Sequence, residues 1–386
     1  MYRVQMMKAD HFHLTDRSTA VRISSNRRFC HLIIALSLAV RSYGIETGEA
    51  SFELLDSDLF KVSLLTARAE GAVDGWELET TLSRTEYDID FRPAPFDLLG
   101  REVHVNRNTH SFSFIATKTL EDSLSLIMGL GLRDGFPNYR AVWLDTYFEQ
   151  HFAPLEGVPG HELYQPFEAS AASFNVGLKW EYLPANGIAT ISLARIQDNV
   201  SPGYEIDFGG IARSERVLAT SSISLTSENV LSQRLRSRVA LSASETSARE
   251  VRYTGEVALN AALGERFICR NKSGALTENP QFDAYFYGTA FEHSVSDVLS
   301  LSINARRYSD TGVVGNALLF TTAAPGLRND CLGIGLRYAG ESWSAKLNAK
   351  HSHSNFEPTN ANTDFFRNLY VDADWLTLQL AFAKRF

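Results

Sequence analysis

The stretch SFNVGLKWEY, residues 173–182, alternates apolar and polar side chains without a break. Successive side chains of a β-strand point to opposite sides, so Phe174, Val176, Leu178 and Trp180 would share one face. The other face would carry serine, asparagine, glycine, lysine and glutamate. This period of two predicts a strand with one apolar face and one polar face.

The same alternation recurs along the chain after residue 44, while helical spacing is nowhere sustained. The further segments are 124–133, 231–243, 251–261, 299–305, 332–338 and 343–349. Many of them exceed the roughly five or six residues usual in a soluble sheet, and they approach the length that a tilted strand needs to cross a bilayer. The pattern therefore favours strands that span a membrane.

The connections between these segments fall into two kinds. Short turns are expected at 120–122, 184–187, 227–229, 263–265, 294–297 and 340–341. Longer polar stretches are expected at 88–103, 135–170, 200–215, 310–329 and 352–367. Alternation of short and long connections is typical of a membrane barrel with tight turns on one rim and long loops on the other.

The N-terminal residues 1–44 have the order of a signal peptide. Arg27 and Arg28 precede the apolar run 32–40, and the small residues Ser42 and Gly44 follow it. A basic, apolar and small-residue sequence predicts export with cleavage near Gly44. The alternative for the apolar run is a buried core helix, since it is too short to span a membrane.

Composition excludes several other classes of protein. Apolar residues make up 44% and charged residues 21% of the chain, which argues against disorder. The net charge is −8 and becomes more negative without the basic leader, so a nucleic-acid partner is not expected. Only Cys269 and Cys331 follow residue 44, which is too few for a disulfide-built fold, and free thiols are expected.

The C-terminal segment 375–386 carries a family resemblance. Apolar residues occupy alternate positions and the chain ends in an aromatic residue, at Leu376, Leu378, Leu380, Phe382 and Phe386. The segment resembles the C-terminal strand of bacterial outer-membrane β-barrel proteins, which the barrel-assembly machinery recognises. Lys384 departs from the pattern, because an aromatic or apolar residue is more usual there. No porin subfamily is indicated.

Together, the resemblance and the alternation imply an all-β fold for residues 45–386. We expect a single closed antiparallel transmembrane β-barrel of about 16 strands, with about 14 as the alternative, short periplasmic turns and long extracellular loops. A closed barrel pairs every backbone N–H and C=O group inside the hydrocarbon, where an unpaired group costs several kcal/mol. The expected location is the outer membrane of a Gram-negative-type bacterium, with the apolar faces toward its lipids.

Basic side chains recur on the polar faces and would line the lumen. They are Arg234, Arg236, Arg238, Arg306, Arg337, Lys346 and Lys350. The long stretch 135–170 contains Asp145 and Glu149, which could face the three arginines 234, 236 and 238 across a constriction, as in general porins. The alternative is that these arginines pair with carboxylates of neighbouring strands, such as Glu256, and fill the lumen.

The function expected from this pattern is an outer-membrane channel that passes small hydrophilic solutes by passive diffusion, without cofactor, metal or chemical step. The alternatives are a structural, ligand-binding or adhesive barrel with a closed lumen, a barrel hydrolase, and a soluble secreted β-sandwich. No nucleophile elbow, metalloprotease motif or phosphate loop is present in the sequence, so an enzyme is not expected. The implied partners are lipids, the assembly machinery and small solutes; a homo-oligomer is compatible with the pattern.

Overall fold

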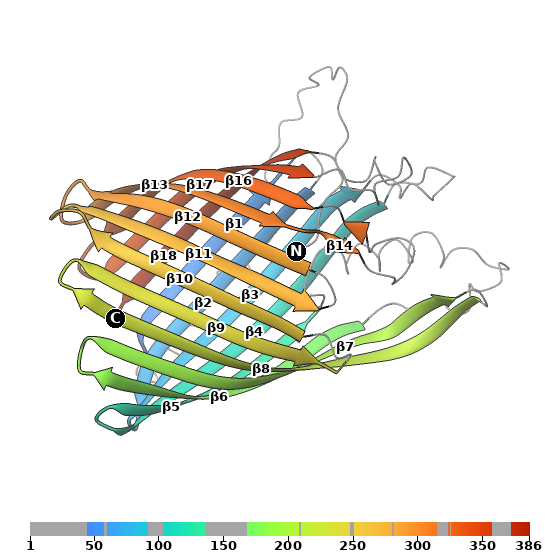
Figure 1. Ribbon diagram of the computed structural model, residues 1–386, viewed down its shortest axis with the longest axis horizontal. Coiled ribbons are helices and arrows are strands. Elements are labelled where there is room, and N and C mark those ends of the chain that lie inside the picture. The colour runs from blue at the N-terminus through green and yellow to red at the C-terminus, as the bar shows by residue number, and fades with distance from the viewer. Residues whose placement is uncertain are drawn as a thin grey trace, which may run out of the picture.

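The computed structural model describes residues 45–57, 60–91, 103–135, 168–207, 210–247, 251–279, 282–314, 323–324, 326–356 and 372–386. In this part of the chain, 16 antiparallel strands close into one barrel (Figure 1). The expected closed antiparallel barrel is therefore confirmed, with the larger of the two strand numbers considered. The described part contains no candidate membrane-spanning helix.

The first eight barrel strands are β1 (Ile45–Asp56), β2 (Phe60–Val73), β3 (Trp76–Phe91), β4 (Val103–Glu121), β5 (Leu124–Asp134), β6 (Glu168–Leu183), β7 (Gly187–Asp207) and β8 (Gly210–Ser232). The other eight are β9 (Leu235–Thr246), β10 (Val251–Ala262), β11 (Phe267–Asn279), β12 (Phe282–Ser294), β13 (Leu299–Asp310), β16 (Leu327–Ala339), β17 (Trp343–Phe356) and β18 (Ala373–Arg385). Each strand pairs with the next in this series, and β18 pairs with β1 to close the ring. The two-residue strands β14 (Val313–Val314) and β15 (Ala323–Ala324) form a separate small sheet.

Apolar side chains line up across neighbouring strands on one face of the wall. Phe52, Leu380, Leu347, Leu336 and Leu301 are register partners from β1 through β18, β17 and β16 to β13. Between 38% and 50% of each of these residues is exposed, so they do not meet in a dry interior. This face is the outer one, where hydrocarbon can cover it.

The opposite face of the strands points into the lumen. There, Arg133 of β5 and Asp198 of β7 form an ion pair across the intervening strand β6. Such a contact between strands that are not neighbours suits the concave side of a closed sheet, where side chains converge. The alternation seen in the sequence thus separates an apolar outer wall from a polar inner wall.

The two rims of the barrel differ in their connections. One rim, here called the turn end, carries tight turns such as 184–186 between β6 and β7 and 340–342 between β16 and β17. It lies at the left in Figure 1, together with the C-terminus. Near it, the Trp343 ring stacks on Tyr338 at 4.3 Å and on Phe382 at 5.8 Å between centroids. Aromatic clusters of this kind mark the headgroup level of membrane barrels.

Two expected connections are wrong. The expected turn at 227–229 lies inside β8, and the turn comes at residues 233–234. The Ser-Glu-Asn sequence favours a turn, but these residues form strand because they pair with β7 on one side and β9 on the other. The expected loop at 200–215 is mostly strand, since β7 and β8 pair up to the connection at 208–209. This hairpin extends beyond the rest of the wall at the right of Figure 1.

The C-terminal strand has the predicted outward face. Leu378, Leu380, Phe382 and Phe386 are all exposed on the outer wall. The backbone N–H of Phe386 donates a hydrogen bond to the carbonyl of Glu46 at 2.9 Å, which fastens the end of the chain to the start of β1. Residues 1–44 lie outside the described residues, so the signal peptide stays a prediction.

Lys384 also lies on the outer face, as the partner of Trp343 in the register of β17 and β18. Its Nζ atom is 5.1 Å from the centre of the Phe386 ring, a cation–π contact. The lysine stem can cover apolar surface while the ammonium group stays near the turn end. The departure from the family pattern is therefore compatible with the outer surface of the barrel.

At some positions of the inner wall, neighbouring atoms leave no room for any residue larger than glycine. A methyl group on Gly177 of β6 would lie 2.9 Å from the backbone oxygen of Ile191 and 3.0 Å from Cβ of Ser192. We expect Gly177→Ala to destabilise the barrel by about 1–3 kcal/mol, because β7 must shift. The urea midpoint of unfolding measures this. Gly264→Ala, where nothing lies within 4 Å, is the control, and equal midpoints for both variants would contradict the packing.

Candidate functional site: the inner wall

Cationic side chains gather on the inner faces of β9 to β17. We call this set the basic arc: Arg236, Arg238, Arg252, Arg270, Lys272, Arg306, Arg337, Lys346 and Lys350. The carboxylates described on the inner faces of the same strands are fewer: Glu256, Glu292 and Asp310. This side of the lumen therefore carries an excess of positive charge.

The inner faces of β1 to β3 have the opposite sign. We call this set the acidic arc: Glu49, Glu53, Glu70, Glu77 and Glu79, with Arg68 among them. In the ring of 16 strands, β1 to β3 lie half a circuit from β9 to β11, so the part of the basic arc on β9 to β11 faces the acidic arc across the lumen. The other end of the basic arc, on β17, is separated from β1 by β18 alone. Opposed charges of this kind create a field across a pore.

Several members of the basic arc are paired. Arg238 lies 3.4 Å from Glu228 of β8, and Lys272 lies 2.8 Å from Glu256. The pair of Arg238 and Glu228 matches the alternative that arginines pair with carboxylates of neighbouring strands. Glu256, the carboxylate named in that alternative, binds Lys272 and not an arginine. Arg306 instead lies over the ring of Phe286, with its guanidinium carbon 5.0 Å from the ring centre.

Six of the basic residues predicted from the sequence lie on the inner wall: Arg236, Arg238, Arg306, Arg337, Lys346 and Lys350. The seventh, Arg234, does not, because it lies in the turn between β8 and β9. The expected ladder of three arginines on the inner face is therefore wrong for Arg234, and only Arg236 and Arg238 form it. The predicted acidic partners Asp145 and Glu149 lie outside the described residues.

The inward charged groups are accessible to water. The side chains of Arg238, Arg270, Lys272 and Arg337 are 50%, 47%, 52% and 55% exposed although they point into the lumen. A lumen filled by its own side chains would bury such groups. The inner wall of the described residues is thus polar and charged, and these four cationic side chains are about half exposed.

A hollow of about 460 Å³ lies on the inner wall, and no sequence pattern predicted it. Its charged lining residues are Glu49, Arg270, Glu292, Arg337, Lys346 and Lys350. It lies over β16, where Gly333 and Gly335 face inward. A methyl group on Gly335 would lie 2.5 Å from both Asn348 Oδ1 and Ser302 Oγ, so these polar groups occupy the space that the glycine leaves.

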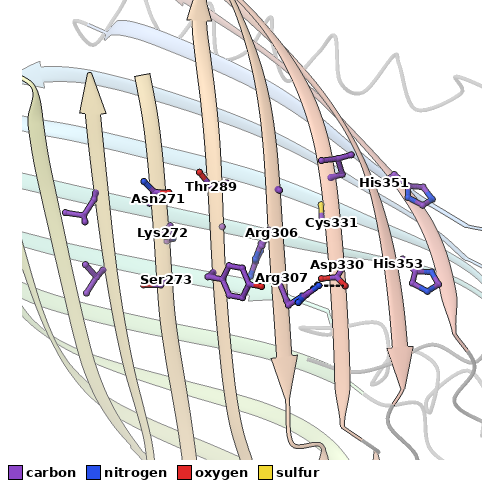
Figure 2. A pocket seen from close by; sticks show the side chains of 16 residues that line it. Asn271, Lys272, Ser273, Thr289, Arg306, Arg307, Asp330, Cys331, His351 and His353 are labelled. Carbon is purple, nitrogen blue, oxygen red and sulfur yellow. Dashed lines mark hydrogen bonds and ion pairs between the residues drawn. The ribbon is translucent and has the colours of Figure 1, made fainter. Parts of the chain in front are cut away.

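A second hollow, of about 660 Å³, lies against the outer side of the same wall (Figure 2). The apolar side chains Val257, Leu259 and Leu332 contribute to it. Figure 2 shows the ion pair between Arg307 and Asp330, with Nε and Oδ1 2.5 Å apart, at one side of this groove. Nothing in the structure indicates what covers the groove.

Comparison with known proteins supports the fold. No family model and no curated protein matches the sequence. A structure described as a bacterial polysaccharide outer membrane secretin has a TM-score of 0.50 and 9% identity, over 89% of this chain and 99% of that chain. CdiB from Acinetobacter baumannii has a TM-score of 0.54 and 9% identity, over 88% of this chain but only 60% of that chain.

The fold is that of the bacterial outer-membrane β-barrel proteins. At 9% identity the likeness shows the fold alone and indicates no subfamily.

Proposed function

We propose that this protein is a water-filled channel that passes small hydrophilic solutes across the bacterial outer membrane by passive diffusion. The observation that carries the proposal is the inner wall, whose charged side chains point inward and are half exposed. Barrels of 16 to 18 strands leave an aqueous channel in known porins. The likeness to an outer-membrane secretin supports a transport role for the barrel.

The inner wall would act on solutes without a chemical step. Serine, threonine and asparagine side chains replace part of the hydration shell of a polar solute, while an apolar solute gains nothing on entering. The field between the acidic arc and the basic arc would orient dipolar solutes and favour those that present opposite charges to the two sides. Passage then depends on size, polarity and charge.

Conductance through a planar lipid bilayer tests this proposal. Addition of the folded, detergent-solubilised protein is expected to give stepwise increases in current, because each inserted barrel opens one aqueous path. Protein unfolded by boiling serves as the control and should give no steps. If folded protein inserts but never conducts, the lumen is closed, which would favour a structural or ligand-binding barrel.

A further inference from the structure

Two cations face each other directly in the inner hollow. Arg337 of β16 and Lys346 of β17 are register partners, so both side chains stand on the inner face at the same level. Like charges directly opposite each other on a sheet are destabilising. Glu292, the only carboxylate paired with Arg337 among the described residues, is 4.0 Å from it and lies closer to Arg270, at 2.6 Å. Lys346 has no carboxylate partner in the same part of the chain.

The acidic arc shows how this barrel compensates an opposed pair of like charges. Glu70 of β2 and Glu79 of β3 are register partners on the inner face. Arg68 bridges them, with its Nη2 atom 2.6 Å from Glu70 and 2.8 Å from Glu79. The corresponding bridge between Arg337 and Lys346 would have to be an anion. Glu49 and Glu292 line the same hollow, but among the described residues neither forms an ion pair with Lys346, so neither bridges the two cations.

Groups that bind hydroxyls surround this pair. Asn304, Asn348 and Ser302 approach over Gly333 and Gly335, since methyl groups on these glycines would lie 2.5–2.8 Å from their polar atoms. Asn348 Nδ2 donates to Gln379 Oε1 at 3.4 Å, and Gln379 in turn donates to Glu53, so the two amides are held in place. Lys350 lines the same hollow as a further cation.

We propose that this hollow binds small hydroxylated solutes that carry an oxyanion, either a phosphate or a carboxylate. The oxyanion lies between Arg337 and Lys346, where it supplies the missing bridge, and the hydroxyls bind Asn304, Asn348 and Ser302. Charge-assisted hydrogen bonds to an oxyanion are stronger than neutral ones. The inference rests on the proposed function, because a solute reaches the hollow through a hydrated lumen.

Calorimetric titration of the detergent-solubilised barrel at low ionic strength tests the binding directly. Glucose 6-phosphate is expected to bind, and glucose at the same concentration is not. Lys346→Ser should weaken the binding about tenfold or more, the equivalent of one charge-assisted hydrogen bond, whereas Lys346→Arg should retain it. Gluconate distinguishes the two oxyanions: similar affinity includes carboxylates, and no binding restricts the hollow to phosphates.

The matched control is Lys179→Ser, which removes an inner-wall lysine on β6, on the other side of the ring from β16. It should leave the affinity unchanged, and heat-modifiable gel mobility shows that each variant is folded. Equal binding of glucose and glucose 6-phosphate, equal affinity of wild type and Lys346→Ser, or no binding to the wild type would overturn the inference. Binding without conductance would instead refute the channel and leave the hollow intact.

Discussion

An arginine in place of Leu380 is expected to destabilise the inserted barrel, whereas an arginine in place of the adjacent Gln379 is expected to be tolerated. Leu380 lies on the outer wall, 50% exposed, in the row that joins Phe52 to Leu347. A charged side chain near the middle of the lipid face costs about 2–4 kcal/mol. Gln379 faces the lumen and donates to Glu53, a carboxylate that an arginine at this position could also bind.

Refolding into lipid vesicles over a series of urea concentrations measures the difference. The fraction of protein that shows heat-modifiable mobility should fall at a lower urea concentration for Leu380→Arg than for the wild type. Gln379→Arg is the matched control, since it adds the same charge one residue away on the other face of the same strand. The assignment of inner and outer walls would be refuted if both variants were equally impaired.

The second large effect is expected in ion selectivity. The double variant Arg236→Glu/Arg306→Glu replaces two positive charges of the basic arc, neither of which has a carboxylate partner among the described residues. We expect the permeability ratio of chloride to potassium to fall by roughly tenfold in bilayers at about 0.1 M salt, where the Debye length is about 10 Å. The reversal potential under a salt gradient gives this ratio.

The acidic arc supplies a control of opposite sign. Glu49→Gln/Glu53→Gln removes two negative charges from β1 and should shift the selectivity toward chloride. Both glutamates face the lumen beside β18, while Arg236 and Arg306 lie on β9 and β13. If the two double variants shift the reversal potential in the same direction, the current does not pass between the two arcs.

The acidic and basic arcs of the barrel wall differ from the constriction expected from the sequence. That hypothesis placed Asp145 and Glu149 of a loop opposite arginines of the wall, and these two carboxylates lie outside the described residues. In the described barrel, the wall itself supplies acidic partners. In β1, Thr47, Glu49, Ser51 and Glu53 occupy alternate positions. This alternation was visible in the sequence and places both glutamates on one polar face.

The sequence was least informative where the two-faced pattern is weak. Strand β11 places Asn271 and Ser273 on the outer face and Ile268 and Leu276 on the inner face. Its apolar residues therefore do not share a side, and a period of two does not identify it. Its register is fixed by β10 and β12, which have clearer faces and pair with it along its whole length.

The alternation of the strands, and with it the choice between an apolar and a polar face, was determined by the sequence alone, because the period of two is a local property of extended backbone. The outward row of the C-terminal strand was predictable for the same reason. Only the closed barrel decided which charges face each other, such as Arg337 and Lys346, or the two arcs across the lumen. Register and ring closure depend on pairing between distant segments, and no local pattern specifies how far one strand slides along its neighbour.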